Sequence, residues 1–181
     1  LGATVKYPQM ASNIEDNTDL VVYTAAISKD NPEYMAACEK NIPMMSRADL
    51  LGQIMKNYKV PIAISGTHGK TTVTSMISQI LIENDFDPSL VIGGKLPLTG
   101  TNGRVGKSET LVCEACEYKD TFLDLTPDIS VILNVDRDHM EYFKTLDRLK
   151  KSFVDFCDMA RVAIVNGDDE NTVSAMLFEN V

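Results

Sequence analysis

The 181-residue chain has no run of eighteen apolar residues, and this absence argues against a membrane-spanning helix. It also lacks a signal-peptide pattern at its start. Because residue 1 is leucine rather than methionine, we expect the chain to be a piece of a longer protein. Its hydrophobic content of 44% is enough for a buried core, so a folded globular structure is expected.

Positive charge is scarce. The chain has 17 lysines and arginines against 26 aspartates and glutamates, which gives a net charge of −9. This balance argues against nucleic-acid binding through a broad basic face. A polyanion can still bind locally, where backbone N–H groups and one lysine supply the positive field.

Cysteine is also scarce, and the four residues Cys38, Cys113, Cys116 and Cys157 form no recognisable disulfide framework. Reduced thiols and a cytoplasmic setting are expected. The pair Cys113 and Cys116 has the spacing of a redox or zinc motif. However, no second cysteine pair or histidine pair follows at ligand spacing, and both thiols lie in a predicted strand. We therefore expect metal-free thiols.

Apolar segments alternate with helical patterns along the chain, which predicts an α/β fold with a mainly parallel sheet. A domain boundary is expected near residues 57–60, giving a first domain over 1–57 and a second over 58–181. We predict strands over residues 20–27, 42–45, 60–65, 90–92, 109–116, 129–135 and 162–165. Helices are predicted over 32–41, 47–58, 70–83, 145–159 and 169–179. Gly93-Gly94 is predicted to form a turn, and 99–107 a loop.

The sharpest motif is the loop Gly66-Thr67-His68-Gly69-Lys70-Thr71-Thr72, which lies between the predicted strand 60–65 and the helix 70–83. It matches the end of the phosphate-loop pattern, although Ile64 stands where the first glycine of the full pattern would be. Glycines let backbone N–H groups converge on phosphate oxygens, and the helix N-terminus adds a favourable dipole. Lys70 would reach the β- and γ-phosphates, and the Thr71 hydroxyl would bind Mg²⁺. The loop predicts binding of Mg-ATP.

Two further segments bring polar side chains to the same predicted sheet edge. Glu114 and Glu117 end the strand 109–116, and His139 follows the strand that begins at residue 129. In an open α/β sheet, ligands bind at the carboxyl ends of the strands. A carboxylate and a neutral imidazole beside a triphosphate could form a Mg²⁺ site. From the residues alone, Glu114 could equally be a solvated charge, and His139 an ordinary loop histidine.

The loop Ser65–Thr72, together with Asn134 and the run Asp138-His139-Met140-Glu141-Tyr142, resembles the Mur ligases of bacterial cell-wall synthesis. Segments 23–33, 47–52 and 93–102 extend the resemblance over nearly the whole chain. It implies a central ATP-binding domain with a mainly parallel, doubly wound sheet, preceded by part of a smaller Rossmann-like α/β domain.

The resemblance also implies an activity. The histidine at position 68 and the run from Glu114 to Tyr118 indicate the ligation of L-alanine to the lactyl carboxylate of UDP-N-acetylmuramate, with ATP and Mg²⁺, through an acyl phosphate. It implies catalytic roles for Lys70, Glu114 and His139. Thr71, Glu114 and His139 would bind metal, and Asn102 would contact the sugar substrate. No nucleic-acid or membrane partner is expected.

Several alternatives remain open at this point. A related ligase that recycles a whole peptide onto the same sugar would share these motifs. A folate-type polyglutamate ligase is disfavoured by the loop containing His68. A GTPase-like switch would need a guanine-specificity motif such as N-K-x-D, which the chain lacks. An ATP-binding fragment without ligase activity of its own is the remaining possibility.

Overall fold

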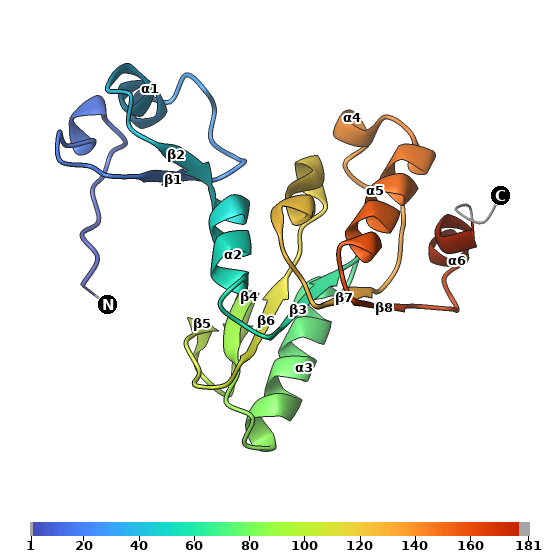
Figure 1. Ribbon diagram of the computed structural model, residues 1–181. Coiled ribbons are helices and arrows are strands. Elements are labelled where there is room, and N and C mark those ends of the chain that lie inside the picture. Colours follow the sequence, from blue (N-terminus) through green and yellow to red (C-terminus); the bar gives the residue numbers. More distant parts are fainter. Residues whose placement is uncertain (1, 178–181) are drawn as a thin grey trace. The chain divides into compact units, whose positions relative to one another are not determined.

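The computed structural model describes residues 2–177, which form two compact units divided between Leu51 and Gly52 (Figure 1). The division falls inside helix α2 (Arg47–Met55), a few residues before the expected boundary. Helix α2 begins with a reciprocal cap. The Ser46 hydroxyl accepts from the Asp49 N–H at 2.9 Å, and the Asp49 carboxylate accepts from the Ser46 N–H at 3.2 Å.

The first unit is a small α/β arrangement. Strands β1 (Val21–Tyr23) and β2 (Met44–Ser46) pair in parallel, and helix α1 (Pro32–Glu39) lies between them in sequence. A 3-10 turn, η1 (Ala11–Asn13), precedes them. Helix α1 begins where predicted, because the Asn31 side chain accepts from two N–H groups of its first turn. The strand predicted over 20–27 is shorter, since the chain turns where the Ile27 N–H bonds the Thr24 carbonyl at 3.0 Å.

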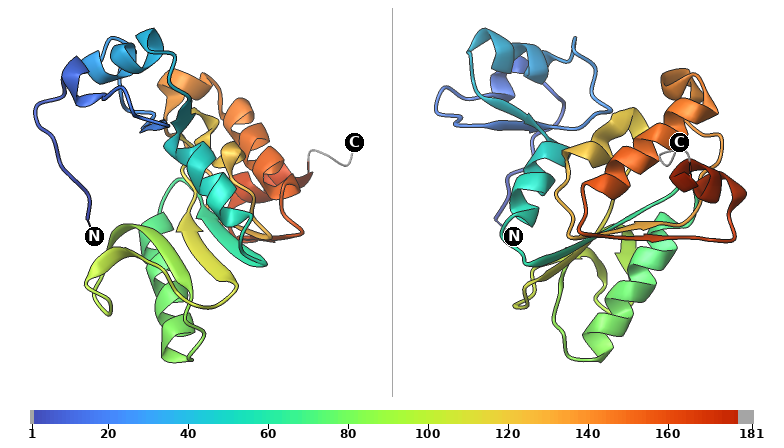
Figure 2. Two further views of the ribbon diagram at one scale, coloured as in Figure 1. Left: turned by 60° about the vertical axis from the view of Figure 1, so that its left-hand side comes forward. Right: turned by 45° about the vertical axis from the view of Figure 1, so that its right-hand side comes forward.

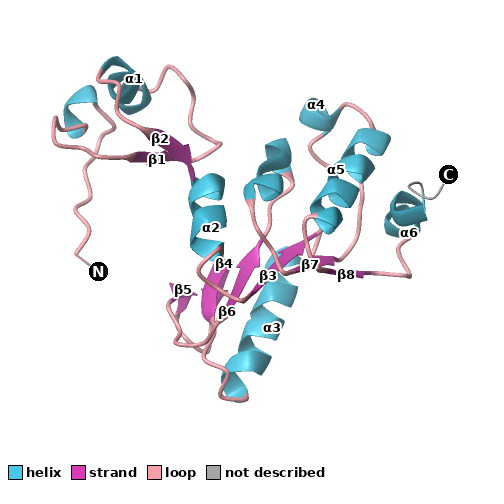
Figure 3. Ribbon diagram, viewed as in Figure 1, coloured by secondary structure: helices cyan, strands magenta, loops and turns pink. Residues whose placement is uncertain are grey.

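The second unit is built on a six-stranded sheet in the order β5-β4-β6-β3-β7-β8 (Figure 3). Every neighbouring pair is parallel except β4 and β5. Helix α3 packs on one face and α5 on the other (Figure 2). The strands are β3 (Val60–Ser65), β4 (Ser89–Leu96), β5 (Thr101–Arg104), β6 (Thr110–Glu114), β7 (Ile129–Ile132) and β8 (Val162–Val165). The helices are α3 (Lys70–Glu83), the 3-10 segment η2 (Tyr118–Asp124), α4 (Met140–Phe143), α5 (Leu146–Asp158) and α6 (Glu170–Leu177).

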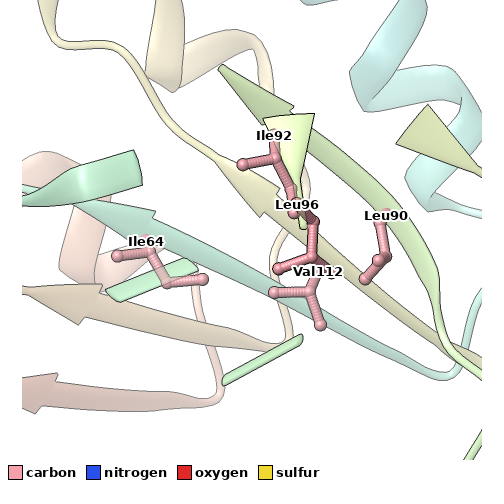
Figure 4. Packing of buried hydrophobic residues seen from close by; sticks show 5 residues of the cluster. All are labelled: Ile64, Leu90, Ile92, Leu96 and Val112. Carbon is pink, nitrogen blue, oxygen red and sulfur yellow. The ribbon is translucent and has the colours of Figure 1, made fainter. Parts of the chain in front are cut away.

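The sheet is covered by apolar side chains on both faces, as expected for a parallel sheet between helices. On the α3 side, strands β3, β4 and β6 contribute a buried cluster of five residues (Figure 4): Ile64, Leu90, Ile92, Leu96 and Val112. On the α5 side, the Phe122 ring stacks on Phe156 at 4.7 Å between centroids and meets Phe153 edge-on at 5.4 Å. Within residues 2–177, no helix is long and apolar enough to cross a membrane.

Two sequence predictions in this unit are wrong. Gly93-Gly94 does not form a turn, because both glycines lie within β4. The segment 99–107 is not only a loop, since Thr101–Arg104 forms the edge strand β5, antiparallel to β4. The hairpin turns instead at Gly100, whose N–H bonds the Leu96 carbonyl at 2.8 Å and whose φ is +66°. The polar sequence of β5 lacks the apolar alternation that marks a strand. The helix predicted over 169–179 is observed as α6, and its last two predicted residues lie outside the described part of the chain.

Strand register sets up the candidate site. Ile64 of β3 pairs with Glu114 of β6, and Ser65 pairs with Ile132 of β7. The carboxyl ends of the three central strands therefore lie side by side. The segments that follow these strands carry the polar residues singled out in the sequence.

Candidate functional site

The loop between β3 and α3 has the backbone shape of a phosphate-binding turn. Gly66 and Gly69 have φ values of +134° and +85°, a region that side chains other than glycine rarely adopt. At Gly66 there is also no room, since a Cβ would lie 3.0 Å from the Leu133 side chain and 3.1 Å from its backbone nitrogen. Helix α3 begins at Lys70, directly after Gly69. The loop thus places the N-terminus of a fourteen-residue helix at the sheet edge.

The segment after β7 braces this loop through the amide of Asn134. Its side-chain oxygen accepts from the His68 N–H at 2.8 Å, and its side-chain nitrogen donates to the His68 carbonyl at 3.0 Å. The Thr67 hydroxyl accepts from the Asp136 N–H at 2.9 Å. These bonds fix the loop before any ligand arrives. A shallow pocket of about 320 Å³ opens over it, lined by Thr67, His68, Gly69, Lys70, Thr71 and Thr72.

Lys70 lies folded back over the loop. Its ammonium donates to the Gly66 carbonyl at 2.6 Å and to the Glu117 carboxylate at 2.9 Å. The Glu117 side chain is only 2% exposed and that of Lys70 19% exposed. A carboxylate this deeply buried needs a paired cation, and Lys70 is that cation.

Glu114 lies on the other side of the loop, at the end of β6. Its carboxylate accepts from the Thr71 hydroxyl at 3.0 Å and from the Gly93 N–H at 2.5 Å. The two glycines of β4 make this approach possible. A Cβ on Gly93 would lie 2.8 Å from a Glu114 oxygen, and one on Gly94 would lie 3.1 Å from the Thr71 methyl group. A hydroxyl and a carboxylate in contact are oxygen ligands of the type that Mg²⁺ prefers.

His139 has different neighbours. Its Nε2 atom lies 4.0 Å from a Glu117 oxygen, and its ring packs on Tyr118 with 4.7 Å between ring centroids. His139 also has a φ of +52° and precedes α4. Ligand atoms of Glu117, Asp138 and His139 all lie within 4.8 Å of one another. The structure therefore groups His139 with Glu117 and Asp138, and groups Glu114 with Thr71.

Asn102 lies apart from this group along the sheet. It is exposed on β5, the edge strand, which is separated from β3 by β4 and β6.

Three features of the site were not predicted from the sequence: the pairing of Glu117 with Lys70, the hydrogen bonds from Asn134 to His68, and the space at Gly93 for the Glu114 carboxylate. Glu117 is separated from Lys70 by 47 residues, so only the strand order could show that they meet.

Two protein-family models match the chain. The model of the Mur ligase middle domain matches residues 64–180, and that of the Mur ligase family catalytic domain matches residues 1–59. The chain belongs to the Mur ligase family.

Similar curated proteins are named UDP-N-acetylmuramate–L-alanine ligase. The Clostridium kluyveri protein is 50% identical over 86% of this chain and 34% of its own length. The Clostridium botulinum (strain Langeland) protein is 48% identical over 99% of this chain and 40% of its own length. This Mur ligase chain thus spans little more than a third of the length of these relatives.

Solved structures of the family have the same fold. The UDP-N-acetylmuramate-alanine ligase of Thermotoga maritima superposes with a TM-score of 0.84 at 28% identity, over 93% of this chain and 40% of its own. A Neisseria ligase that joins UDP-N-acetylmuramate to L-alanyl-γ-D-glutamyl-meso-diaminopimelate gives 0.86 at 21% identity, over 94% and 59%. The second likeness concerns the fold alone.

Proposed function

We propose that the chain carries the ATP-binding part of a ligase that joins L-alanine to the lactyl carboxylate of UDP-N-acetylmuramate. The observation that carries the proposal is the meeting of Lys70, Thr71 and Glu114 around a glycine loop at the carboxyl edge of the sheet. The substrates are inferred from the names of relatives about 50% identical to this chain.

The proposed reaction needs ATP because a carboxylate has no good leaving group. An oxygen of the lactyl carboxylate attacks the γ-phosphorus, and the bond from that phosphorus to the bridging oxygen breaks, which releases ADP. The L-alanine nitrogen then attacks the acyl carbon, phosphate leaves, and the nitrogen gives up a proton. The protein contributes positioning and charge neutralisation.

Each site residue has a proposed role in this scheme. The loop Gly66–Thr72 holds the phosphates through its N–H groups, and Lys70 offsets charge on the phosphoryl group being transferred. Thr71 and Glu114 would hold one Mg²⁺, and Glu114 and His139 would hold a second; bound Mg²⁺ neutralises phosphate charge. Asn102 is proposed to contact the sugar substrate. The oxygen donors of Thr71 and Glu114 fit such an ion, since they already lie in contact.

The test is a chimaera in which residues 1–181 replace the matching segment of the Clostridium botulinum relative, which aligns over 182 residues. Phosphate release is measured with Mg-ATP, UDP-N-acetylmuramate and either L-alanine or the tripeptide named for the Neisseria ligase. Release with L-alanine is expected. Release with the tripeptide alone would favour the peptide-recycling activity, and release with neither would contradict the ligase proposal.

A loop variant completes this test. Lys70→Ala should abolish release, but it also leaves the buried Glu117 carboxylate without its cation, and losing one partner of a buried pair costs roughly 3–5 kcal/mol of stability. The double variant Lys70→Ala/Glu117→Gln removes both charges and should fold better while remaining inactive. Activity in the double variant would contradict the role given to Lys70.

A further inference from the structure

The Lys70 ammonium has no donor to spare in this structure. An ammonium carries three N–H donors. Those of Lys70 point at the Gly66 carbonyl, 2.6 Å away, at the Thr67 carbonyl, 3.3 Å away, and at both oxygens of Glu117, at 2.9 and 3.2 Å. A phosphate that binds in the loop must therefore take at least one of these donors from its present acceptor.

Among these acceptors, Glu117 is the one that a bound phosphate would repel most strongly. It is the one charged group among the three, and it is buried, so solvent screens it little. It also stands where β6 leads into η2, whose N-cap it is, and the His139 Nε2 atom lies 4.0 Å from a Glu117 oxygen. Glu117 thus lies between two residues to which the proposed reaction gives roles.

We propose that Glu117 is a positioning residue that holds the Lys70 ammonium over the loop until phosphate competes for it. The proposal rests on the proposed function, since it assumes that the loop binds phosphates. In the empty site, Glu117 keeps the ammonium oriented over the loop, and so prevents the lysine from swinging into solvent. On binding, the phosphate oxygens share the ammonium, and Glu117 is left facing the incoming negative charge.

The change in phosphate affinity on replacing Glu117 with glutamine distinguishes between two roles for this residue. Glutamine has nearly the shape of glutamate and keeps an oxygen that can accept from Lys70, but it carries no charge. If Glu117 only supported the fold, its replacement would loosen the loop and weaken phosphate binding. If Glu117 competes with phosphate, replacement removes a repulsion and strengthens binding.

The experiment uses inorganic tripolyphosphate, which needs no contact to an adenine ring, in the presence of EDTA so that no cation bridges the carboxylates. Backbone amide signals of Gly66 and Gly69 report binding in ¹H–¹⁵N NMR titrations of the whole 181-residue chain. We expect Glu117→Gln to lower the dissociation constant about tenfold, because one nearby unscreened charge is removed. Equal or weaker binding by the folded variant would overturn the proposal.

Glu109→Gln is the matched control. Glu109 precedes β6, its side chain is 64% exposed, and its carboxylate pairs with Lys59 at 2.6 Å. The substitution Glu109→Gln therefore removes one negative charge from the same part of the chain without changing a contact of Lys70. Its dissociation constant should stay within about twofold of the wild type, because exposed charges are screened. If Glu109→Gln also lowered the dissociation constant tenfold, the effect would come from net charge alone. That result would refute the role of Glu117.

A measurement on the wild-type protein tests the same proposal and does not depend on how the variant folds. The ¹³C signal of the Glu117 carboxylate should shift during the same titration, in step with the loop amides. Loop amides that shift while this carboxylate signal stays still would overturn the proposal and leave the phosphate loop intact. Loop amides that do not respond to tripolyphosphate at all would instead contradict the proposed function.

Discussion

The Thr71 hydroxyl donates a hydrogen bond to the Glu114 carboxylate across 3.0 Å, and so joins the first turn of α3 to the end of β6. The second oxygen of Glu114 accepts from the Gly93 N–H of β4 at 2.5 Å. One carboxylate thus connects three elements around the loop. Its position depends on the absence of a side chain at residue 93.

Gly93→Ala should displace this carboxylate with little damage to the fold. The new Cβ would lie 2.8 Å from a Glu114 oxygen, which is the end of a flexible side chain and can move away. We expect a loss of stability below about 1 kcal/mol. The affinity for Mg²⁺ with a non-hydrolysable ATP analogue, measured by calorimetry, should fall at least about tenfold, because a displaced ligand no longer meets the ion.

Gly103→Ala on β5 is the control for this substitution. A Cβ there would meet only the Leu90 carbonyl at 3.5 Å, an ordinary contact distance. This variant should bind as the wild type does. Wild-type affinity in Gly93→Ala would show that clearance at residue 93 does not set the position of Glu114.

A second prediction concerns the ion that Glu114 and His139 are proposed to share. Glu114 contacts Thr71, whereas His139 is grouped with Glu117 and Asp138, so a shared ion must draw the two groups together. Mn²⁺ added with the ATP analogue should broaden the NMR signals of the His139 ring and the Thr71 methyl group at the same metal concentration. Broadening of Thr71 alone would leave His139 outside the metal site.

The sequence predicted the bounds of an element best where its local pattern is strongest. Strands β3 and β8 and helix α3 have the predicted bounds, because each is an apolar or amphipathic segment bounded by turn residues. Gly93-Gly94 was wrongly predicted to form a turn because paired glycines usually mark one. Here the pair is needed for close approach of neighbouring side chains inside a strand.

The partners within the site could not be predicted in the same way. The residues of the loop followed from its motif, but the contact between Lys70 and Glu117 depends on β6 lying next to β3. Strand order is set by packing of the whole sheet, and local sequence does not encode it. The distinction between Glu114 and Glu117 is a further example: they are three positions apart, yet one contacts Thr71 and the other is buried beneath Lys70.

A third prediction concerns the cysteines, none of which is in a disulfide among the described residues. Burial, with a smaller contribution from Glu114, raises the pKa of Cys113 to about 12, and burial raises that of Cys157 to about 11. At pH 8 almost no thiolate forms at either site, so iodoacetamide should modify only the exposed Cys38 and Cys116 in the native protein.

Denaturation should expose all four thiols to the reagent. Cys116→Ser should then reduce the native count from two to one. Elemental analysis of the purified chain should find no stoichiometric zinc. Zinc bound in equal amount, or rapid native modification of Cys113, would contradict the assignment of buried, metal-free thiols.

The last prediction concerns Asp169, which directly precedes α6 and also braces the loop side of the sheet. One carboxylate oxygen accepts from the Thr172 N–H at 2.8 Å, from the Thr172 hydroxyl at 2.7 Å and from the Val135 N–H at 3.1 Å. Val135 follows Asn134, the residue that clamps the phosphate loop. Burial by itself raises the pKa of Asp169, but the hydrogen bonds from Thr172 and Val135 outweigh it, and the pKa lies below its ordinary value.

A folded-state pKa below the unfolded value means that the ionised carboxylate stabilises the fold above the unfolded pKa, near 3.9, and that this contribution is lost as the pH falls through the folded pKa. Asp169→Asn keeps a capping oxygen and loses the charge. It should lower the free energy of unfolding by about 1 kcal/mol at pH 7.

Urea titrations followed by circular dichroism should show this difference shrinking between pH 5 and 3, because the wild-type carboxyl also becomes neutral. Asp168→Asn, at an exposed neighbouring position, should match the wild type throughout. A difference for Asp169→Asn that stays constant down to pH 3 would show that the charge of Asp169 contributes nothing to the stability of this edge of the sheet.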